Sequence, residues 1–181
     1  HTWRGLHHMN IAALRFFTVS GPRQRPDLAI SRFMRQIAAG EPIRLFGDGA
    51  TSRDYTFIDD IVSGVIAAGE EIHRHGWRIW NLGGNRSVTL RDLVKSIEKV
   101  VGARAALQWA ETQPGDVSRT CADLTRSREE LQYTPKTSLE DGLRRQWSWM
   151  QANAALAAAA DDFRPMDVVV KPAPGAGAVA P

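Results

Sequence analysis

Cysteine and long apolar runs are nearly absent from this chain of 181 residues. Its one cysteine, Cys121, excludes an internal disulfide and a cysteine-rich metal site, and it favours a reducing compartment. No apolar run approaches the roughly 20 residues that cross a bilayer, and the first residues do not resemble a signal peptide. We therefore expect a cytoplasmic protein without a membrane partner or a metal site. Because the chain begins with His1 rather than Met, we also expect that its true start is missing.

A concentrated charge of either sign is also lacking. Arginine supplies 19 of the 23 basic residues, which are interspersed with 20 acidic residues and leave a net charge of +3. A protein that binds nucleic acid usually carries a denser basic stripe, so we expect no nucleic-acid partner. The hydrophobic content of 43% suffices for the core of one domain. Pro, Ala and Gly dominate from Asp161 onward and predict a disordered tail over residues 161–181.

Strand-like and helix-like segments alternate along the rest of the chain, which is typical of an α/β fold. Apolar and β-branched runs that end in turns predict strands over residues 11–19, 43–46, 77–82 and 105–109. Helical spacing predicts helices that begin near residues 27, 59, 89, 126 and 138, the last of them extending to about residue 160.

Several helix ends carry residues that suit capping. Asp27 and the pair Asp59-Asp60 are expected to cap the helices that follow them, because Asp side chains accept hydrogen bonds from first-turn N–H groups. Two further pairs have the spacing of a capping box, Thr89 with Asp92 and Ser138 with Asp141. In the helix after Asp59-Asp60, the apolar face is expected to consist of Ile61, Val62, Val65 and Ile66.

The turn after the first strand carries the clearest functional signal. Gly21-Pro22 ends the apolar run, and Arg23 and Arg25 follow at once. Ligands of open α/β sheets bind at the carboxyl ends of strands, and a guanidinium binds carboxylate or phosphate. The residues alone therefore predict a site for an anionic ligand at this strand end.

Four segments in order resemble the extended short-chain dehydrogenases that act on nucleotide sugars, and among them most closely the UDP-glucuronate 4-epimerases. The resemblance covers roughly residues 2–150. It rests on these segments: Leu14 to Asp27, Arg53 to Asp60, Asn81-Leu82-Gly83-Gly84 and Gln113-Pro114-Gly115-Asp116-Val117. It implies a Rossmann-type NAD(P)-binding fold with a small α/β substrate-binding domain, and a homodimeric parent protein.

In such enzymes, as the resemblance implies, NAD takes a hydride from C4 of the UDP-sugar and returns it to the opposite face, with a tyrosine as base and a lysine four residues later. The only tyrosines here, Tyr55 and Tyr133, are followed four positions on by Asp59 and Thr137. A loop with three correctly spaced glycines is also not found. We therefore expect no catalytic residue in the chain and no turnover by it alone.

From this count we expect a carboxyl-terminal portion of the enzyme. The amino-terminal nucleotide-binding half would be absent, and NAD would be bound mainly by that missing half. Residues 1–22 would supply the last helix end and a late strand of the Rossmann domain. Residues 23–160 would form mostly the UDP-sugar-binding domain, with some returning Rossmann elements, before the tail over 161–181.

The resemblance also assigns contacts near the reacting sugar. Phe17 matches the position beside the nicotinamide of NAD, and Thr18 matches a position that faces the substrate. Arg25 matches an arginine associated with the sugar carboxylate, and a guanidinium suits a planar carboxylate. Ser20 replaces a common tyrosine, which should loosen the turn without removing a charge.

Contacts to the nucleotide are implied further along the chain. Arg44, Leu45 and Phe46 match the segment that lies along uracil. Arg53 matches the clamp on the diphosphate, and Asp116 lies in a loop that reaches the ribose.

Other interpretations of the same residues remain open. The chain could be a non-catalytic nucleotide-sugar binding remnant, or its parent could be a UDP-glucuronate decarboxylase or a nucleotide-sugar 4,6-dehydratase. Without the resemblance, Arg25 is a solvated loop residue, and Arg53 forms a structural pair with Asp54 or Asp59.

Overall fold

The computed structural model describes residues 2–112 and 115–154. Its elements are α1 (Thr2–His7), β1 (Ile11–Phe16), β2 (Thr18–Ser20), α2 (Ala29–Ala39), β3 (Ile43–Phe46), β4 (Ser52–Phe57), α3 (Ile58–His75), β5 (Trp77–Leu82), β6 (Ser87–Thr89), α4 (Leu90–Val101), β7 (Leu107–Ala110), α5 (Thr125–Leu131) and α6 (Leu139–Ala152).

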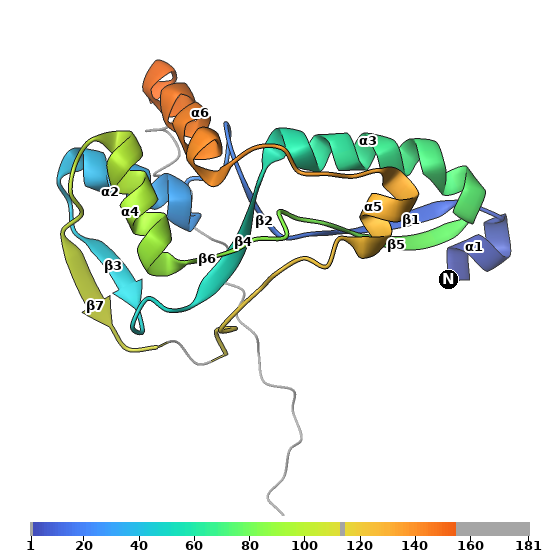
Figure 1. The fold of residues 1–181 in the computed structure, drawn as a ribbon, viewed down its shortest axis with the longest axis horizontal. Coiled ribbons are helices and arrows are strands. Elements are labelled where there is room, and N and C mark those ends of the chain that lie inside the picture. The colour runs from blue at the N-terminus through green and yellow to red at the C-terminus, as the bar shows by residue number, and fades with distance from the viewer. Residues whose placement is uncertain (1, 113–114, 155–181) are drawn as a thin grey trace, which may run out of the picture.

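The strands form three small sheets. Strands β1 and β5 pair in parallel from Ile11 opposite Trp77 to Phe16 opposite Leu82. Strand β4 pairs in parallel with β2 and antiparallel with β6, and β3 pairs in parallel with β7. Figure 1 shows α3 and α5 beside the β1–β5 pair, and α2 and α4 beside the β3–β7 pair at the other end of the molecule.

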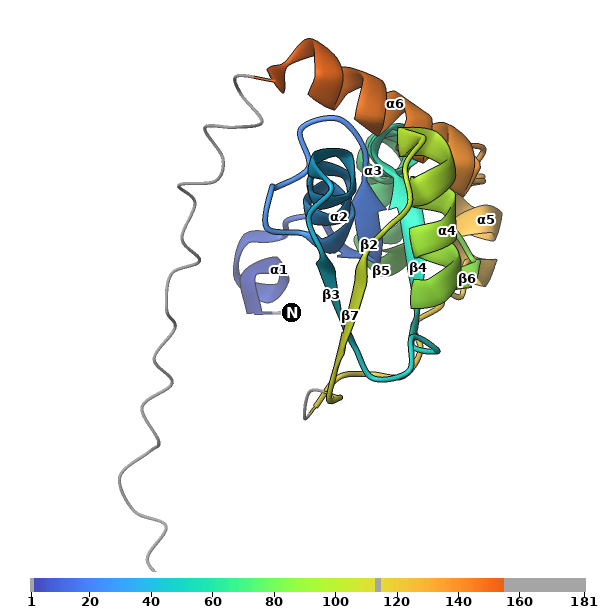
Figure 2. The ribbon, with the colours of Figure 1, turned by 90° about the vertical axis from the view of Figure 1, so that its left-hand side faces the viewer.

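Two clusters of buried apolar side chains hold these layers together. The first core joins α2, β3, α4 and α6, and the second core joins α3, β5, α5 and the segment around Ala122. Helix α6 packs on α4 and lies across the top of this end of the molecule in Figure 2. Strand β4 contacts α6, which belongs to the first core, and α3, which belongs to the second.

The carboxylate of Asp54 on β4 joins the β5–β6 turn to the segment before α5. Its side chain is fully buried and accepts backbone N–H groups from Gly84 at 2.7 Å, Asn85 at 3.0 Å and Ala122 at 2.8 Å. A buried carboxylate is costly unless such hydrogen bonds replace its hydration. Three distant segments are therefore fixed around one side chain.

This arrangement explains the glycine pair at the end of β5. A Cβ atom on Gly84 would lie 2.7 Å from Asp54 Oδ1 and 3.1 Å from the Tyr55 carbonyl oxygen. A Cβ atom on Gly83 would lie 2.5 Å from the Ala122 side chain. Only glycine allows the backbone to come this close to the carboxylate.

The helix ends that follow local rules agree with the sequence. Thr89 accepts a hydrogen bond from the Asp92 N–H, and Ser138 accepts one from the Asp141 N–H, each at 3.1 Å. Gly40 and Gly102 end α2 and α4 in the left-handed conformation. These predicted boundaries are confirmed.

Two predicted caps are wrong. Leu28 and Phe57, in extended conformation, precede α2 and α3, and neither helix has a side-chain cap. Asp27 instead pairs with Arg25, and Asp60 accepts the N–H groups of residues 136 and 137. The Asp60 carboxylate therefore binds backbone groups that are distant in sequence and does not cap α3.

The predicted single strand over residues 11–19 is also wrong. It divides into β1 and β2, because Phe17 leaves the β5 register and Thr18 pairs with Tyr55 on β4. The chain thereby passes from one sheet to the next at Phe17, whose N–H donates to the Leu82 carbonyl oxygen at 3.2 Å.

The predicted apolar face of α3 is rotated. Val62, Val65 and Ile66 are exposed, whereas Ile61, Gly64 and Ala68 are buried. The helix lies so close to β5 that a Cβ atom on Gly64 would be 2.6 Å from the Leu82 side chain. The small residues therefore allow close packing and turn the larger aliphatic side chains outward.

Within residues 2–112 and 115–154, no helix is long and apolar enough to cross a membrane. The predicted tail over 161–181 and the end of the last predicted helix, residues 155–160, lie outside the described residues.

Replacing the carboxylate of Asp54 tests its role as the junction. In Asp54→Asn, one carboxylate oxygen becomes an NH2 group, which in either orientation faces a donating backbone N–H, that of Gly84 on the Oδ1 side or those of Asn85 and Ala122 on the Oδ2 side. We expect a loss of about 3 kcal/mol in the free energy of unfolding, measured by urea denaturation.

Asp59→Asn is the matched control, because Asp59 is exposed and pairs with Arg145 at the surface. It should cost less than about 1 kcal/mol. An equal loss in the two variants would contradict the role of Asp54.

Candidate functional site

The turn after β2 presents the two arginines that the sequence singles out. Gly21 is buried with φ of 140°, a conformation that favours glycine, and a Cβ atom there would lie 2.6 Å from Ile58. Arg23 adopts a left-handed φ of 63°. The chain therefore reverses tightly at the end of β2, and the side chains of Arg23 and Arg25 are exposed.

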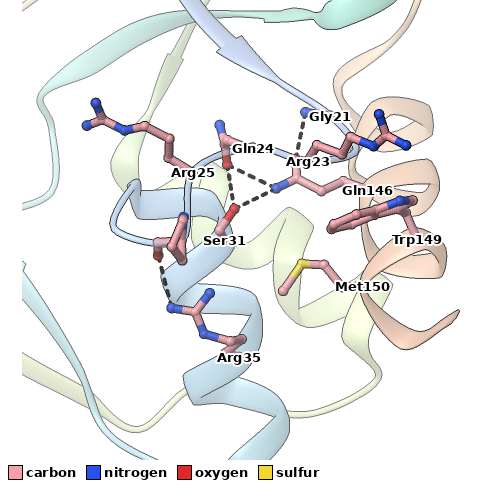
Figure 3. Close-up of a pocket in the computed structure, with 10 residues that line it drawn as sticks. Gly21, Arg23, Gln24, Arg25, Ser31, Arg35, Gln146, Trp149 and Met150 are labelled. Carbon is pink, nitrogen blue, oxygen red and sulfur yellow. Dashed lines mark hydrogen bonds between the residues drawn. The ribbon is translucent and has the colours of Figure 1, made fainter. Parts of the chain in front are cut away.

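A cavity of about 420 Å³ lies between this turn, α2 and the end of α6 (Figure 3). Arg23, Arg25 and Arg35 line it together with Trp149 and Met150 of α6. No Asp or Glu is among its lining residues. The cavity lining therefore combines three arginines with apolar side chains of α6, and Figure 3 shows Arg23 on the side of Trp149, away from Arg25 and Arg35.

Arg25 already holds a carboxylate in a two-point contact. Its Nε and Nη2 atoms donate to the two oxygens of Asp27 at 3.1 and 2.8 Å. The Arg25 side chain remains 63% exposed. The observed pair shows the geometry by which this guanidinium binds a planar carboxylate.

Strand β3 presents a cation and an aromatic ring on the same face. The Arg44 guanidinium lies 5.2 Å from the centroid of the Phe46 ring, and Arg44 is exposed. Leu45, on the opposite face, is 1% exposed and belongs to the first core. Arg44 and Phe46 can therefore contact a ligand through side chains, and Leu45 only through its backbone.

Arg53 and Asp116 form an ion pair, although 63 positions separate them in the sequence. Arg53 Nη1 also donates to the Ser52 carbonyl oxygen at 2.9 Å. The expected alternatives are wrong, because Asp54 binds backbone N–H groups and Asp59 pairs with Arg145 at 2.6 Å. The structure thus brings together two residues that were assigned to one nucleotide.

The remaining predicted positions lie where β1 passes into β2. Phe17 is half-buried and packs against the second core, and Thr18 lies opposite Tyr55 of β4. The cavity beside Arg25 is lined by none of the other predicted contacts. The structure therefore places these residues in separate groups around β2, β3 and β4.

Both tyrosines are held in the neutral form. Burial raises the pKa of Tyr55 to about 12, an effect that the nearby charge of Arg53 lowers in part. Burial, followed by the charges of Asp60 and Asp54, raises the pKa of Tyr133 further. A general base needs a pKa near the working pH, so neither tyrosine is suited to that role.

Two polar residues near these groups were missed from the sequence. Gln146 of α6 is 1% exposed and accepts a hydrogen bond from the Gly21 N–H at 2.8 Å. The Arg91 guanidinium lies 5.3 Å from the Trp109 ring centroid and donates to the Asp48 carbonyl oxygen at 2.5 Å. Of these two residues, only Gln146 could have been found from the sequence, because it is a polar residue within the apolar stripe of its helix.

The described residues include no group of three or more His, Cys, Asp or Glu residues that could hold a metal ion. Cys121 is exposed and unpaired with another cysteine.

Comparison with known proteins identifies relatives of the chain. Residues 1–83 match the model of the NAD dependent epimerase/dehydratase family. A UDP-glucuronate 4-epimerase of Thermodesulfobacterium geofontis is 36% identical over 157 residues, which cover 86% of this chain and 48% of that protein. UDP-glucuronate 4-epimerase 1 of Arabidopsis thaliana is 37% identical, over 82% of this chain and 38% of that protein.

The fold is shared with solved structures. The crystal structure of a Bacillus cereus UDP-glucuronic acid 4-epimerase in complex with UDP-glucuronic acid and NAD has a TM-score of 0.78 at 37% identity, covering 84% of this chain and 48% of that chain. A Thermotoga maritima UDP-glucose 4-epimerase with UDP-glucose has a TM-score of 0.77 at 28% identity, covering 84% and 50%. The chain spans about half the length of the bacterial relatives and 38% of the Arabidopsis protein.

The family match corrects the position that we expected for the chain. We expected a carboxyl-terminal portion, with the amino-terminal nucleotide-binding half absent and NAD bound mainly by that missing half. This is contradicted, because the model of the NAD-dependent family matches from residue 1 to residue 83. The matched stretch contains the parallel pair β1–β5 with α3 packed on it, an arrangement typical of Rossmann-type folds.

The raised pKa values predict an unusual tyrosine titration. The folded-state pKa of Tyr55 lies above the ordinary value of 10, so its contribution to stability is complete below pH 10 and is lost as the pH rises toward about 12. We expect little phenolate absorbance at pH 10 in the native chain, and partial ionisation at that pH in guanidinium chloride.

Circular dichroism on the same samples shows whether the fold persists. Ionisation of either tyrosine near pH 10 in a chain with native ellipticity would contradict the burial of that phenol.

Proposed function

We propose, from the match of residues 1–83 to the NAD dependent epimerase/dehydratase family, that the chain carries UDP-sugar-binding residues of a 4-epimerase that acts on UDP-glucuronate. The observation that carries the proposal is the ion pair of Arg53 and Asp116, which brings the residue assigned to the diphosphate beside the residue assigned to the ribose. A Bacillus cereus relative that binds UDP-glucuronic acid and NAD supports the choice of ligand.

The nucleotide end of the ligand would lie along β3 and the start of β4. The Phe46 ring offers a stacking surface for uracil, and the Arg44 guanidinium lies beside that ring. A diphosphate would compete with Asp116 for Arg53, because a guanidinium binds phosphate oxygens in the same two-point geometry. Asp116, once released, can accept a hydrogen bond from a ribose hydroxyl.

The sugar end would be recognised by the turn after β2. Arg25 already binds one carboxylate through two N–H groups, and the carboxylate of glucuronate can replace Asp27 with the same geometry. The hydroxymethyl group of UDP-glucose carries no charge and cannot form this ion pair. Arg25 therefore gives a preference for the uronate, and Thr18 is proposed to face the sugar ring.

NAD, when bound, accepts the hydride from C4 of the sugar and returns it to the opposite face. Of the described residues, Phe17 is proposed to lie beside its nicotinamide, since a half-buried aromatic ring suits a planar heterocycle.

A second candidate function is nucleotide-sugar binding without turnover. It is favoured by the two tyrosines, which lack a lysine four residues later and have raised pKa values. A UDP-glucuronate decarboxylase or a 4,6-dehydratase would use the same nucleotide contacts, so product analysis has to distinguish these activities.

Calorimetric titration with UDP, UDP-glucose and UDP-glucuronate tests the proposed contacts. Arg53→Ala should weaken all three ligands by about tenfold, because each contains the diphosphate. Arg25→Ala should weaken UDP-glucuronate by about tenfold and leave UDP within about twofold.

Arg104→Ala is the control, because Arg104 is 91% exposed and pairs only at the surface with Glu98. Equal affinity of the wild-type chain for UDP-glucose and UDP-glucuronate would contradict the proposed role of Arg25. Absence of heat with all three ligands would contradict the site itself.

The missing tyrosine–lysine pair predicts that the purified 181-residue chain does not form UDP-galacturonate from UDP-glucuronate with added NAD. Chromatography of the nucleotide sugars measures this directly. Formation of UDP-galacturonate, or reduction of NAD, would show that other residues supply the base.

A further inference from the structure

Gln146 is a buried polar side chain whose hydrogen bonds all go to the arginine turn or to the helix that follows it. It lies on α6, 125 residues after Gly21, and is 1% exposed. Its neighbours on the same face, Leu143 and Met150, are apolar and belong to the first core. An aliphatic residue would satisfy packing at this position, so the amide calls for a separate explanation.

The amide of Gln146 uses both of its ends. Its Oε1 atom accepts the Gly21 N–H at 2.8 Å, and its Nε2 atom donates to Gln24 Oε1 at 2.9 Å and to Ser31 Oγ at 3.0 Å. Gln24 is held a second time, because its Nε2 atom donates to the Val19 carbonyl oxygen at 2.7 Å. Ser31 Oγ also donates to Gln24 Oε1, at 2.9 Å.

These bonds fix the turn at its beginning, its middle and its exit. Gly21 begins the turn, Gln24 lies between the two arginines, and Ser31 belongs to the first turn of α2. Figure 3 shows the side chains of Arg23 and Arg25 directed to opposite sides of Gln24. The turn is thus held by hydrogen bonds to neutral side chains, which do not compete with a ligand anion for the arginines.

We infer that Gln146 is a positioning residue that holds the turn so that Arg25 meets the sugar carboxylate. The inference rests on the proposed function, in which Arg25 distinguishes UDP-glucuronate from UDP-glucose. Gln146 acts through Gly21 and Gln24 and does not itself touch the sugar. Its loss therefore affects recognition of the carboxylate and spares recognition of the diphosphate by Arg53.

A role in stability alone makes a different prediction. If Gln146 only supports the fold, its replacement lowers the thermal midpoint and leaves the ratio of the two affinities unchanged. The preference for UDP-glucuronate over UDP-glucose is therefore the decisive quantity, because a purely structural effect does not change it.

The experiment compares the wild-type chain with Gln146→Leu, which removes both ends of the amide, and with Ser31→Ala, which removes one partner and keeps the bond to Gly21. Calorimetry gives the affinities for UDP, UDP-glucose and UDP-glucuronate. We expect Gln146→Leu to reduce the preference for the uronate by about fivefold or more, with UDP affinity within about twofold. Ser31→Ala should reduce the preference by about twofold to threefold.

Gln151→Leu is the matched control, because Gln151 is exposed on the same helix. Thermal unfolding shows whether each variant is folded. If Gln146→Leu is unfolded, the change in ligand preference measured for Ser31→Ala tests the role of the hydrogen bonds. An unchanged preference in the folded variants would overturn the role of Gln146 and leave the proposed function intact. A wild-type chain without any preference would overturn the proposed function, on which this role depends.

Discussion

The buried carboxylate of Asp54 is the constraint on which the rest of the structure depends. It binds the backbone of the β5–β6 turn and of the segment before α5, between the first and second cores. Its burial requires these three N–H groups, and their approach requires glycine at position 84. Adjacent residues of β4 point to opposite faces, so the same strand that anchors Asp54 presents Arg53 on the other face, beside Asp116.

The side chains assigned to the ligand are positioned by strands that pair with β4 or pack in the first core. Strand β2 pairs with β4 and ends at the turn that carries Arg23 and Arg25. Strand β3, packed in the first core through Leu45, presents Arg44 and Phe46 outward. Most of the proposed contacts thus belong to strands or to the turn after β2, whereas Asp116 lies in the loop after β7. We propose that the ion pairs of Arg25 and Arg53 exchange their carboxylates for ligand anions without rebuilding the backbone.

Local chemistry made part of this predictable from the sequence. The Thr89 and Ser138 caps and the Gly40 and Gly102 ends depend on residues within one turn of the helix. The division of β1 from β2 and the rotated face of α3 depend on strand pairing and on the close approach of Gly64 to Leu82, which periodicity does not reveal. The pair Arg53–Asp116 and the bonds of Gln146 join segments that only the folded chain brings together. The resemblance supplied the ligand class of the proposal, but the expected carboxyl-terminal position of the chain was corrected by the family match over residues 1–83.

A crystal structure of the chain soaked with UDP-glucuronate tests the central claim most directly. The account predicts the diphosphate on Arg53 in place of Asp116, the uracil on Phe46 and the uronate carboxylate on Arg25 in place of Asp27. A UDP-glucuronate molecule bound elsewhere, with the Arg53–Asp116 and Arg25–Asp27 pairs intact, would contradict it.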